Sequence, residues 1–495
     1  MSSPLRRLLV VAALANGACA PIAGSVAEPA RAPETSGPAP LMPVPKPRQQ
    51  AWQELEYYAF VHFNMNTFTG REWGDGSESP ALFAPTALDC RQWARVAKSA
   101  GMKGIILTAK HHDGFCLWPS KLSEHTVAHS PWREGQGDVV RELSEACREA
   151  GLLMGVYLSP WDRNSAVYGD SPKYNDYYAA QLEELLSGYG EIFEVWWDGA
   201  CGEGPNGKRQ VYDFEHFTQI VRRLQPNAVI FSDIGPDIRW VGNESGFAGE
   251  TCWSMLRTEG FARGIGAPPT SSLNEGDVSG PNWVPAECDV SIRPGWYYHA
   301  EQDGEVKSLD HLFDLYERSV GHNGSLLLNL PVDRRGLVHE NDAARLVELR
   351  QRIEGTYGVD LARGARTSAS ETRGNGTRFA AEKLVDGDPK TFWAANDGAT
   401  SAILTLELAQ PVLIERVVLR EPIALGQRVA RFFVEGRVDG AWRRIGEGTT
   451  IGNKRILRTP ALVMDAVRLT IEESRAAPAI SAFELAALPR KTLAR

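Results

Sequence analysis

The chain has 495 residues, which is too long for one ordinary hydrophobic core and predicts two folded domains with extensions. Its hydrophobic content of 43% and charged content of 23% are typical of a soluble globular protein. The formal net charge of −9 argues against nucleic acid as the main partner, because binding to phosphates requires a basic surface. Composition therefore indicates a globular protein that does not bind nucleic acid.

The first 20 residues have the pattern of a signal peptide. A pair of arginines precedes an apolar run over residues 8–14, and small residues follow around Cys19. This run is too short to span a bilayer as a permanent helix. Cleavage near Ala20 predicts an exported protein, in the periplasm or outside the cell. The alternative is a lipoprotein tethered to the membrane through Cys19, although Asn16 stands where the lipoprotein motif usually has leucine.

Residues 21–50 have the composition of a spacer without regular structure. Eight prolines lie between Pro21 and Pro47, mixed with alanine and glycine. Such a spacer could hold an enzyme away from a membrane, or it could simply follow the export signal.

Residues 51–360 alternate predicted strands with predicted amphipathic helices. Repeated strand–helix units over this length predict a (β/α)8-type barrel, with a doubly wound open sheet as the alternative. No GxGxxG motif follows the first predicted strand and no P-loop motif occurs in the sequence, which weakens the alternative. We expect strands at residues 57–63, 103–108, 153–158, 192–197, 228–232, 296–299 and 325–330. We expect helices at residues 89–100, 137–150, 174–188, 212–224 and 309–320.

Polar residues stand where successive predicted strands end. In a (β/α)8 barrel these ends meet on one rim, and that rim holds the active site. One such residue would mean little, but the repetition predicts a site at this rim. The residues concerned are His62, His111, His112, Asp113, Tyr157, Asp198 and Asp233.

Several motifs in the region from residue 51 to residue 357 resemble a known family. The segments EYYAFVHF (56–63), NTFTGREWG (66–74), KHHDGF (110–115) and EVWWDGA (194–200) resemble glycoside hydrolase family 29, the α-L-fucosidases, and occur in the family's order. The fuller run at 107–119, together with GVYLSPWD (155–162), resembles the 1,3/1,4-specific subfamily. The resemblance implies an exo-acting enzyme without a cofactor, whose partner is a fucosylated oligosaccharide or glycoconjugate.

A retaining glycosidase needs two carboxyl groups, one that attacks the anomeric carbon and one that protonates the leaving oxygen. Asp198 follows an apolar strand and precedes Gly199, so its carboxylate should project from the rim, and the resemblance implies that it is the nucleophile. The resemblance also favours Glu244 as the acid/base. Glu250 and Glu287 remain alternatives, and each of these glutamates could instead be a solvated loop carboxylate.

The resemblance places further residues against fucose. Neutral imidazoles can donate or accept hydrogen bonds, as sugar hydroxyls require. A metal site is the alternative for the histidine pair. Adjacent strand residues point to opposite faces, however, so His111 and His112 should not both bind one ion, and we expect no metal. The expected substrate-binding residues are His62, Glu72, Trp73, His111, His112, Tyr157 and Trp253.

A branched, Lewis-type glycan would need a second pocket, for galactose, beside the fucose site. The loops after Asp198 and Asp233 are long enough to form it, or they could be merely an ordered rim. Arg239 could reach the substrate or pair with a carboxylate. The loop residues suited to a sugar are Glu203, Asn206, Trp240, Asn243 and Trp253.

Beyond residue 361 the helix patterns fade and short β-rich runs appear. Turn residues separate these runs, which predicts an antiparallel β-sandwich over residues 361–490. The segments KLVDGD (383–388) and TFW (391–393) resemble the discoidin-like (F5/8 type C) domain that often accompanies such enzymes. The predicted strands lie at residues 402–408, 414–419, 432–435 and 466–471.

The cysteines and two adjacent tryptophans allow predictions about which side chains are buried. Outside the leader six cysteines are scattered without a CxxC pair, so they should be buried thiols rather than disulfides. Trp196 and Trp197 are adjacent, so one should pack inside the barrel and the other between the barrel and its helices.

Three other functions remain open at this point. A catalytically silent carbohydrate-binding protein would keep the fold, although the presence of both Asp198 and an acid candidate speaks against it. A broad-specificity α-L-fucosidase would lack the linkage preference. A metallohydrolase barrel would need a bound metal.

Overall fold

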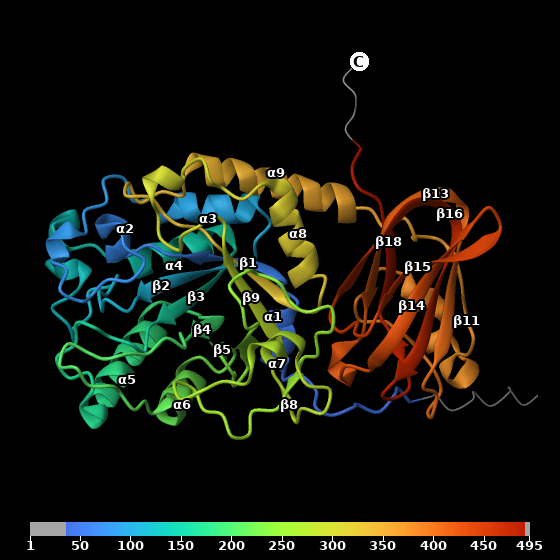
Figure 1. Ribbon diagram of the computed structural model, residues 1–495, viewed down its shortest axis with the longest axis horizontal. Coiled ribbons are helices and arrows are strands. Elements are labelled where there is room, and N and C mark those ends of the chain that lie inside the picture. Colours follow the sequence, from blue (N-terminus) through green and yellow to red (C-terminus); the bar gives the residue numbers. More distant parts are fainter. Residues whose placement is uncertain (1–35, 491–495) are drawn as a thin grey trace, which may run out of the picture. The chain divides into compact units, whose positions relative to one another are not determined.

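The computed structural model describes residues 36–490, and the chain from Pro38 onward forms one compact unit. Its first part is a closed barrel of parallel strands in the order β1-β10-β9-β6-β5-β4-β3-β2 (Figure 1). The predicted (β/α)8-type barrel is therefore confirmed. The strands are β1 (Tyr57–Val61), β2 (Gly104–Lys110), β3 (Leu153–Leu158), β4 (Glu194–Trp196), β5 (Val229–Ser232), β6 (Ile238–Trp240), β9 (Ala286–Ser291) and β10 (Ser325–Asn329).

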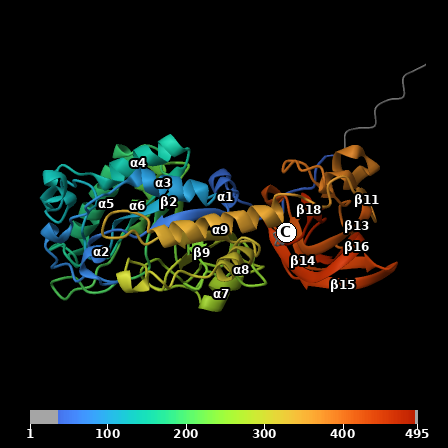
Figure 2. The same cartoon turned by 90° about the horizontal axis from the view of Figure 1, so that it is seen from above.

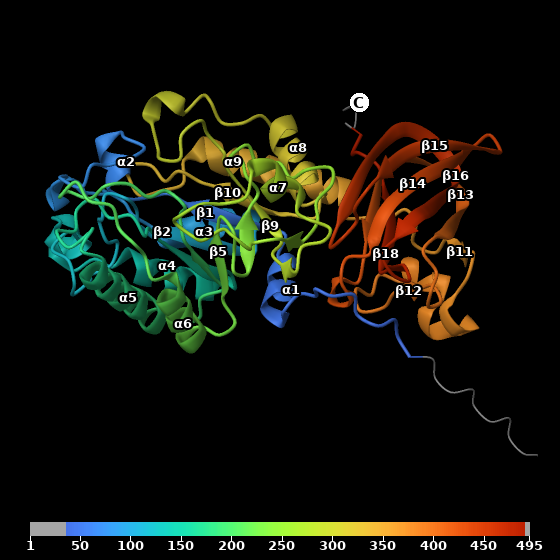
Figure 3. The same ribbon diagram turned by 60° about the horizontal axis from the view of Figure 1, so that its bottom comes forward.

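Helices cover the outside of the barrel, and Figure 3 shows α5 and α6 side by side along it. The helices α3, α4 and α6 each begin after an aspartate whose side chain accepts an N–H of the first turn, which satisfies a donor that the helix itself leaves free. The helices are α1 (Pro47–Gln53), α2 (Met65–Thr69), α3 (Cys90–Ser99), α4 (Val139–Ala150), α5 (Ser171–Gly188), α6 (Phe214–Leu224), α7 (Thr270–Glu275), α8 (Leu309–Ser319) and α9 (Glu340–Tyr357).

One side of the barrel departs from the regular strand–helix repeat. A short loop without a helix joins β5 to β6, and the connection from β6 to β9 contains α7 and the two-stranded sheet of β7 (Met255–Leu256) and β8 (Asn282–Trp283). The prediction missed β6 and β9, because no amphipathic helix separates them in the usual way. The strand predicted at residues 296–299 was wrong: this segment is a loop beyond β9.

The barrel has an aromatic interior and a separate core beneath its helices. The Trp196 ring stacks on Phe231 inside the barrel at a centroid distance of 4.0 Å. Trp197 points outward, and its ring lies 5.3 Å from that of Phe214 at the start of α6. The predicted alternation of these two tryptophans is confirmed.

The second part of the compact unit is antiparallel, as predicted. A sheet runs in the order β11-β13-β16-β14-β15 with β18 paired to β13, and β12 and β17 form a small second sheet. The strands β13 and β16 are long and pair with register shifts. The strand β13 spans what the sequence suggested were two separate strands, and β16 extends well beyond the one strand predicted at residues 466–471. The strands are β11 (Arg366–Ala369), β12 (Trp393–Ala394), β13 (Ala402–Arg420), β14 (Val429–Val438), β15 (Ala441–Gly448), β16 (Arg455–Ser474), β17 (Ala479–Ile480) and β18 (Ala482–Ala486).

The segment that precedes the barrel packs against both parts. The Leu41 N–H donates to the Leu425 carbonyl at 2.9 Å, and the buried Gln49 amide in α1 donates to the Asp237 and Trp283 carbonyls. The described end of the predicted spacer is therefore ordered, unlike the prediction. The predicted signal peptide and Cys19 lie outside the described residues.

Two further predictions concern the cysteines and membrane-spanning helices. The six cysteines between Cys90 and Cys288 are free, and all of them are buried except the half-buried Cys201, as predicted. Among residues 36–490, no helix is both long and apolar enough to cross a membrane. Figure 2 shows from above that α9 lies along the barrel, where it contacts α3 and α8.

Candidate active site

A pocket opens at the mouth of the barrel, where the carboxyl ends of the strands meet. Eight of the nine predicted catalytic and substrate-binding residues line it, although they come from six separate segments of the chain, whereas the rim residues Asp113 and Asp233 do not line it. The predicted residues in this pocket are His62, Glu72, Trp73, His111, His112, Tyr157, Asp198 and Glu244. The pocket is completed by Phe60, Trp196, Ala200, Asp289 and Trp296, which the sequence analysis did not select.

Asp198 follows β4 and points into this pocket. Its Oδ2 accepts a hydrogen bond from the Tyr157 hydroxyl at 3.0 Å, and its Oδ1 accepts one from the Ala200 N–H at 2.7 Å. The side chain is 24% exposed, so one face of the carboxylate remains open to a ligand. Asp198 is thus oriented by two donors and accessible at the same time.

A second carboxyl group lies beside Asp198. Gly199 permits this approach, because a Cβ atom there would lie only 2.3 Å from Asp233 Oδ2. Burial, together with the Asp198 charge, raises the pKa of Asp233 to about 6. The glycine after Asp198 therefore has a steric reason, which is the close packing of the strand end against Asp233.

The two adjacent histidines do not point to opposite faces as the sequence analysis expected. The strand β2 ends at Lys110, after a register shift against β3, so His111 and His112 lie beyond the regular strand. Their ring centroids are 4.1 Å apart, and both rings line the pocket. The expectation was wrong because strand alternation does not continue past the strand end.

The hydrogen bonds of His112 determine which of its nitrogens faces the pocket as an acceptor. The Ser159 hydroxyl donates to the Trp161 carbonyl at 2.6 Å, so it must accept from His112 Nδ1 at 2.7 Å. His112 Nε2 then carries a lone pair, 3.8 Å from Asp198 Oδ2. A hydroxyl group of a ligand could donate to either acceptor.

His62 has the same arrangement through a different partner. The Asn329 amide nitrogen donates to the Ser291 hydroxyl and to the Trp296 carbonyl, both at 2.9 Å, so Asn329 Oδ1 accepts from His62 Nδ1 at 2.7 Å. Burial lowers the pKa of His62 to about 3 and lowers those of His111 and His112 as well. The pocket therefore presents neutral imidazoles.

Of the three glutamates considered as the acid, the structure brings only Glu244 to the pocket. Its Oε2 accepts a hydrogen bond from Trp296 Nε1 at 3.2 Å. Glu250 is exposed outside this pocket, and its carbonyl accepts from Arg455 Nη1 at 2.6 Å. Glu287 is fully buried inside the barrel and accepts from Trp196 Nε1 at 2.8 Å.

Glu72 and Trp73 both line the pocket, but they contact different residues. The Glu72 carboxylate bonds the N–H of Trp296 at 3.0 Å and the imidazole of His299 at 2.7 Å. Trp73 is 55% exposed, and its ring meets those of His112 and Trp161 edge to face. Trp73 thus presents an open aromatic face at the rim.

Two residues have positions that differ from the sequence analysis. Trp253 does not reach the pocket: it packs with Met255, Trp283 and Ile423, and the Arg475 guanidinium lies 5.5 Å from its ring. Arg239 reaches neither the substrate pocket nor a carboxylate. It is fully buried and donates to the carbonyls of Leu273, Val284 and Trp253, which fixes the loops after β6.

In the loops that were predicted to bind a second sugar, three of the candidate side chains form hydrogen bonds with other parts of the protein. The Asn206 amide donates to the Tyr168 carbonyl at 2.6 Å, and the Asn243 amide donates to the Phe247 carbonyl at 3.0 Å. Glu203 is exposed, and Trp240 Nε1 donates to Asp289. None of these four residues lines the pocket that contains Asp198.

Asp289 is the main polar residue that the sequence analysis missed. It is 4% exposed, and its Oδ1 accepts from Trp240 Nε1 at 2.9 Å. Burial raises its pKa well above the ordinary value, and the charges of Glu287 and Glu244 act in the same direction. Glu287 and Asp289 are two residues apart, so they face the same side of a strand, which was the signal available in the sequence.

Metal ligation finds no support in the arrangement of these side chains. Within residues 36–490, the structure contains no group of three or more histidine, cysteine, aspartate or glutamate residues placed to hold a metal ion. The donors in the pocket instead suit the hydroxyl groups of a sugar.

Comparison with known proteins agrees with this geometry. The family model described as alpha-L-fucosidase matches residues 44–354, and the F5/8 type C domain model matches residues 366–485. The chain is 44% identical over 448 residues to alpha-L-fucosidase 1 of Arabidopsis thaliana. This alignment covers 90% of the chain and 87% of the plant protein.

Solved structures give the same result. The crystal structure of SpGH29 superposes with a TM-score of 0.87 at 42% identity, covering 92% of this chain and all of that one. A Ruminococcus gnavus GH29 fucosidase in complex with fucose superposes with a TM-score of 0.85 at 32% identity, covering 92% of this chain and 97% of that chain. The chain belongs to the α-L-fucosidase family, glycoside hydrolase family 29, and carries a C-terminal F5/8 type C domain.

Proposed function

We propose that the protein is a retaining exo-α-L-fucosidase that releases α-1,3/1,4-linked L-fucose from branched, Lewis-type glycans. The observation that carries the proposal is the presence of Asp198 and Glu244 in one pocket, in a chain of the fucosidase family. A retaining enzyme needs such a pair of carboxyl groups around one anomeric carbon. The Ruminococcus gnavus relative solved with fucose supports a fucose-binding pocket of this kind.

In the first step, an Asp198 carboxylate oxygen bonds to the anomeric carbon while the bond to the glycosidic oxygen breaks. Glu244 gives its proton to that oxygen, and the shortened glycan leaves as an alcohol. The hydrogen bonds from Tyr157 and from the Ala200 N–H orient Asp198 for this attack. In the second step, Glu244 takes a proton from water, the water oxygen bonds to the anomeric carbon, and the Asp198 carboxylate is released.

The floor of the pocket supports exo action. The buried rings of Phe60 and Trp196 close the pocket toward the barrel interior, so a glycan chain has no path through it. The neutral imidazoles of His62 and His112 each present an acceptor nitrogen toward the hydroxyl groups of one terminal sugar. A single fucose residue at the end of a branch fits this arrangement.

The linkage preference rests on the resemblance of residues 107–119 and 155–162 to the 1,3/1,4-specific subfamily. A second sugar next to fucose requires contacts at the rim of the pocket. The exposed Trp73 and the half-buried Trp161 provide aromatic surface there, and such surfaces commonly stack on sugars.

The predicted leader supports export to the periplasm or the exterior, as a free protein or as a lipoprotein tethered through Cys19. Mass spectrometry of the mature N-terminus distinguishes these forms. A free form starts after the leader without lipid, whereas a lipoprotein starts at an acylated Cys19.

The chemical test uses Asp198→Gly. We expect turnover to fall roughly 10³-fold or more, because the variant lacks the carboxylate that forms the covalent intermediate. Azide fills the space left by the carboxylate and should restore part of the rate by forming a fucosyl azide of inverted configuration. A variant that retains near wild-type turnover would exclude Asp198 as the nucleophile.

The linkage test compares a Lewis-type trisaccharide with 2′-fucosyllactose on the wild-type protein. We expect kcat/KM to be roughly 100-fold higher for the trisaccharide, because contacts with the second sugar orient the scissile bond. Comparable values would refute the 1,3/1,4 preference and leave the fucosidase proposal intact.

A further inference from the structure

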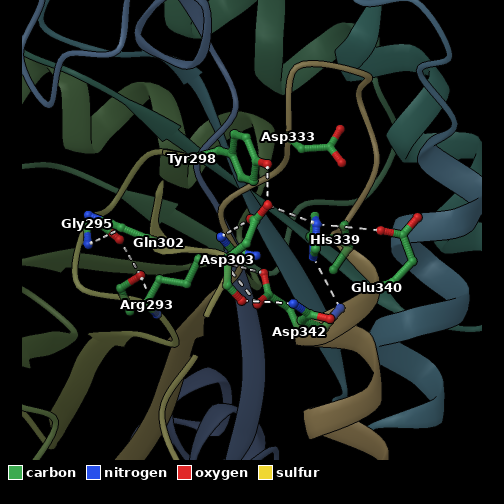
Figure 4. A network of polar contacts seen from close by, with 12 residues as sticks. Arg293, Gly295, Tyr298, Gln302, Asp303, Asp333, His339, Glu340 and Asp342 are labelled. Atoms are coloured by element: carbon green, nitrogen blue, oxygen red, sulfur yellow. Dashed lines mark hydrogen bonds and ion pairs between the residues drawn. The ribbon is translucent and has the colours of Figure 1, made fainter. Parts of the chain in front are cut away.

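The loop that follows β9 is fixed at its base by a buried ionic network, shown in Figure 4. Arg293 is fully buried, and its Nε bonds Asp342 Oδ2 of α9 at 2.9 Å. Its Nη1 bonds Asp303 Oδ1 at 2.7 Å, and the other carboxylate oxygen of Asp303 accepts from the Tyr298 hydroxyl at 3.2 Å. The network joins both ends of the segment 293–303 to α9, so this loop cannot move freely.

The tip of the same loop is held by Glu72, in the loop after α2, and by Asn329, at the end of β10. Glu72 Oε2 accepts the N–H groups of Trp296 at 3.0 Å and of Tyr297 at 3.4 Å. On the other side, the Asn329 amide donates to the Trp296 carbonyl at 2.9 Å. The backbone of Trp296 is therefore fixed by side chains from two other segments, the loop after α2 and the end of β10.

The indole of Trp296 points from this fixed backbone toward Glu244. Its Nε1 donates to Glu244 Oε2 at 3.2 Å, and its ring lies 5.2 Å from that of His62 on the other side. Glu244 belongs to the exposed segment after β6. Within residues 36–490, the indole is the hydrogen-bond partner that the structure gives to the Glu244 carboxyl group.

We infer that Trp296 is a positioning residue for Glu244: its indole N–H holds the carboxyl group of an otherwise exposed side chain over the glycosidic oxygen. The inference rests on the proposed role of Glu244 as the acid/base. Trp296 would act on proton transfer through Glu244, and not only as a wall that the sugar ring contacts. This distinction is measurable, because the loss of proton donation lowers the rate most for substrates with a poor leaving group.

The test uses Trp296→Phe, which keeps an aromatic ring and removes the N–H group. The kcat/KM value is measured for a Lewis-type trisaccharide, whose leaving group is a sugar alcohol, and for an aryl fucoside whose phenol is strongly acidic. The kcat/KM value reports the steps up to and including the cleavage of the glycosidic bond, in which the acid takes part. We expect a loss of roughly tenfold for the trisaccharide and of less than about twofold for the aryl fucoside.

Trp240→Phe is the matched control, because Trp240 Nε1 donates to another carboxyl group of the pocket, Asp289, at 2.9 Å. It removes an equivalent N–H without touching Glu244, so its losses on the two substrates should be equal. Trp296→Leu provides a second variant without the N–H group in case the phenylalanine variant does not fold. Thermal unfolding of each variant identifies the folded ones, and either folded Trp296 variant must show the substrate bias.

Glu244→Ala, measured beside these variants, separates the two proposals. If Glu244→Ala loses far more activity on the trisaccharide while Trp296→Phe loses equally on both substrates, Trp296 is only a wall of the pocket and the inference is wrong. If Glu244→Ala itself loses equally on both substrates, Glu244 is not the acid and the proposed function must be revised. A shared bias of Glu244→Ala and Trp296→Phe, without bias in Trp240→Phe, supports the inference.

Discussion

Buried carboxyl groups have opposite pKa shifts at the barrel mouth and at the contact between the barrel and the C-terminal domain. At the mouth, burial raises the pKa of Asp113 to about 7, and its Oδ2 has no hydrogen-bond partner within residues 36–490. At the contact, burial alone would raise the pKa of Glu56. The charges and hydrogen bonds of Lys454 and Arg420 outweigh it and hold that pKa at about 2.

The difference shows which region is built for stability and which for binding. Glu317 in α8 is 2% exposed and bonds Arg416 Nε at 2.5 Å, Arg458 Nε at 2.7 Å and the Tyr357 hydroxyl at 2.5 Å. The acceptors at the mouth, by contrast, include His112 Nε2, for which the structure gives no hydrogen-bond partner within residues 36–490. Unused hydrogen-bonding groups reduce stability unless a ligand satisfies them.

The largest expected effect on stability is at the contact. Glu317→Ala should lower the free energy of unfolding by about 3–5 kcal/mol, because it leaves the Arg416 guanidinium buried and unpaired. Urea unfolding followed by tryptophan fluorescence measures this loss. The kcat of the folded variant should match the wild type, since Glu317 does not line the pocket.

Glu124→Ala is the control for that prediction. Glu124 is 94% exposed and pairs with His129 at 2.9 Å, so its loss should change the free energy of unfolding by less than about 1 kcal/mol. Equal losses in the two variants would show that the buried network at the contact is no more stabilising than a surface pair.

The next prediction concerns the pH dependence of stability, because the two regions should lose stability over different pH ranges. His62 has an ordinary pKa of 6.5 and a pKa of about 3 in the folded protein, so the unfolded chain takes up the proton first as the pH falls. The corresponding stability is complete above pH 6.5, and about 2 kcal/mol of it should be lost by pH 5. Urea unfolding at pH 7, 6 and 5 should show this slope, reduced in His62→Gln.

The contact region should respond only in stronger acid. The pKa of Glu56 falls from the ordinary 4.5 to about 2 on folding, so its contribution is present above pH 4.5 and lost below it. Glu56→Gln should therefore keep the wild-type slope between pH 7 and 5. A flattened slope in that window would assign the mild-acid instability to the contact instead of the mouth.

The smallest expected effect is that of metal removal. The pocket polar groups form hydrogen bonds or face the open cavity, and the proposed chemistry uses only carboxyl groups and water. Excess EDTA should leave the rate on an aryl fucoside unchanged. A loss of activity that zinc or calcium restores would overturn this description of the mouth.

Secondary structure was largely predictable, and the exceptions have a physical cause. Strands such as β2 and β4 were predicted because each is a short apolar run followed by a predicted amphipathic helix. The strands β6 and β9 were missed because a bare loop and an irregular insertion replace the usual helices. The opposite orientation expected for His111 and His112 was wrong because β2 ends one residue before them.

The sequence by itself determined the barrel, the antiparallel C-terminal domain and the segments whose strand ends line the pocket, since local apolar periodicity encodes strands and helices. Position at a strand end was enough to select Asp198, His62 and Tyr157 as pocket residues. Only the tertiary structure decided which glutamate joins Asp198, that Trp253 packs elsewhere, and that Trp296 and Asp289 complete the pocket. These residues lie on irregular loops or a missed strand, and closure of the barrel, which brings distant segments together, sets their distances.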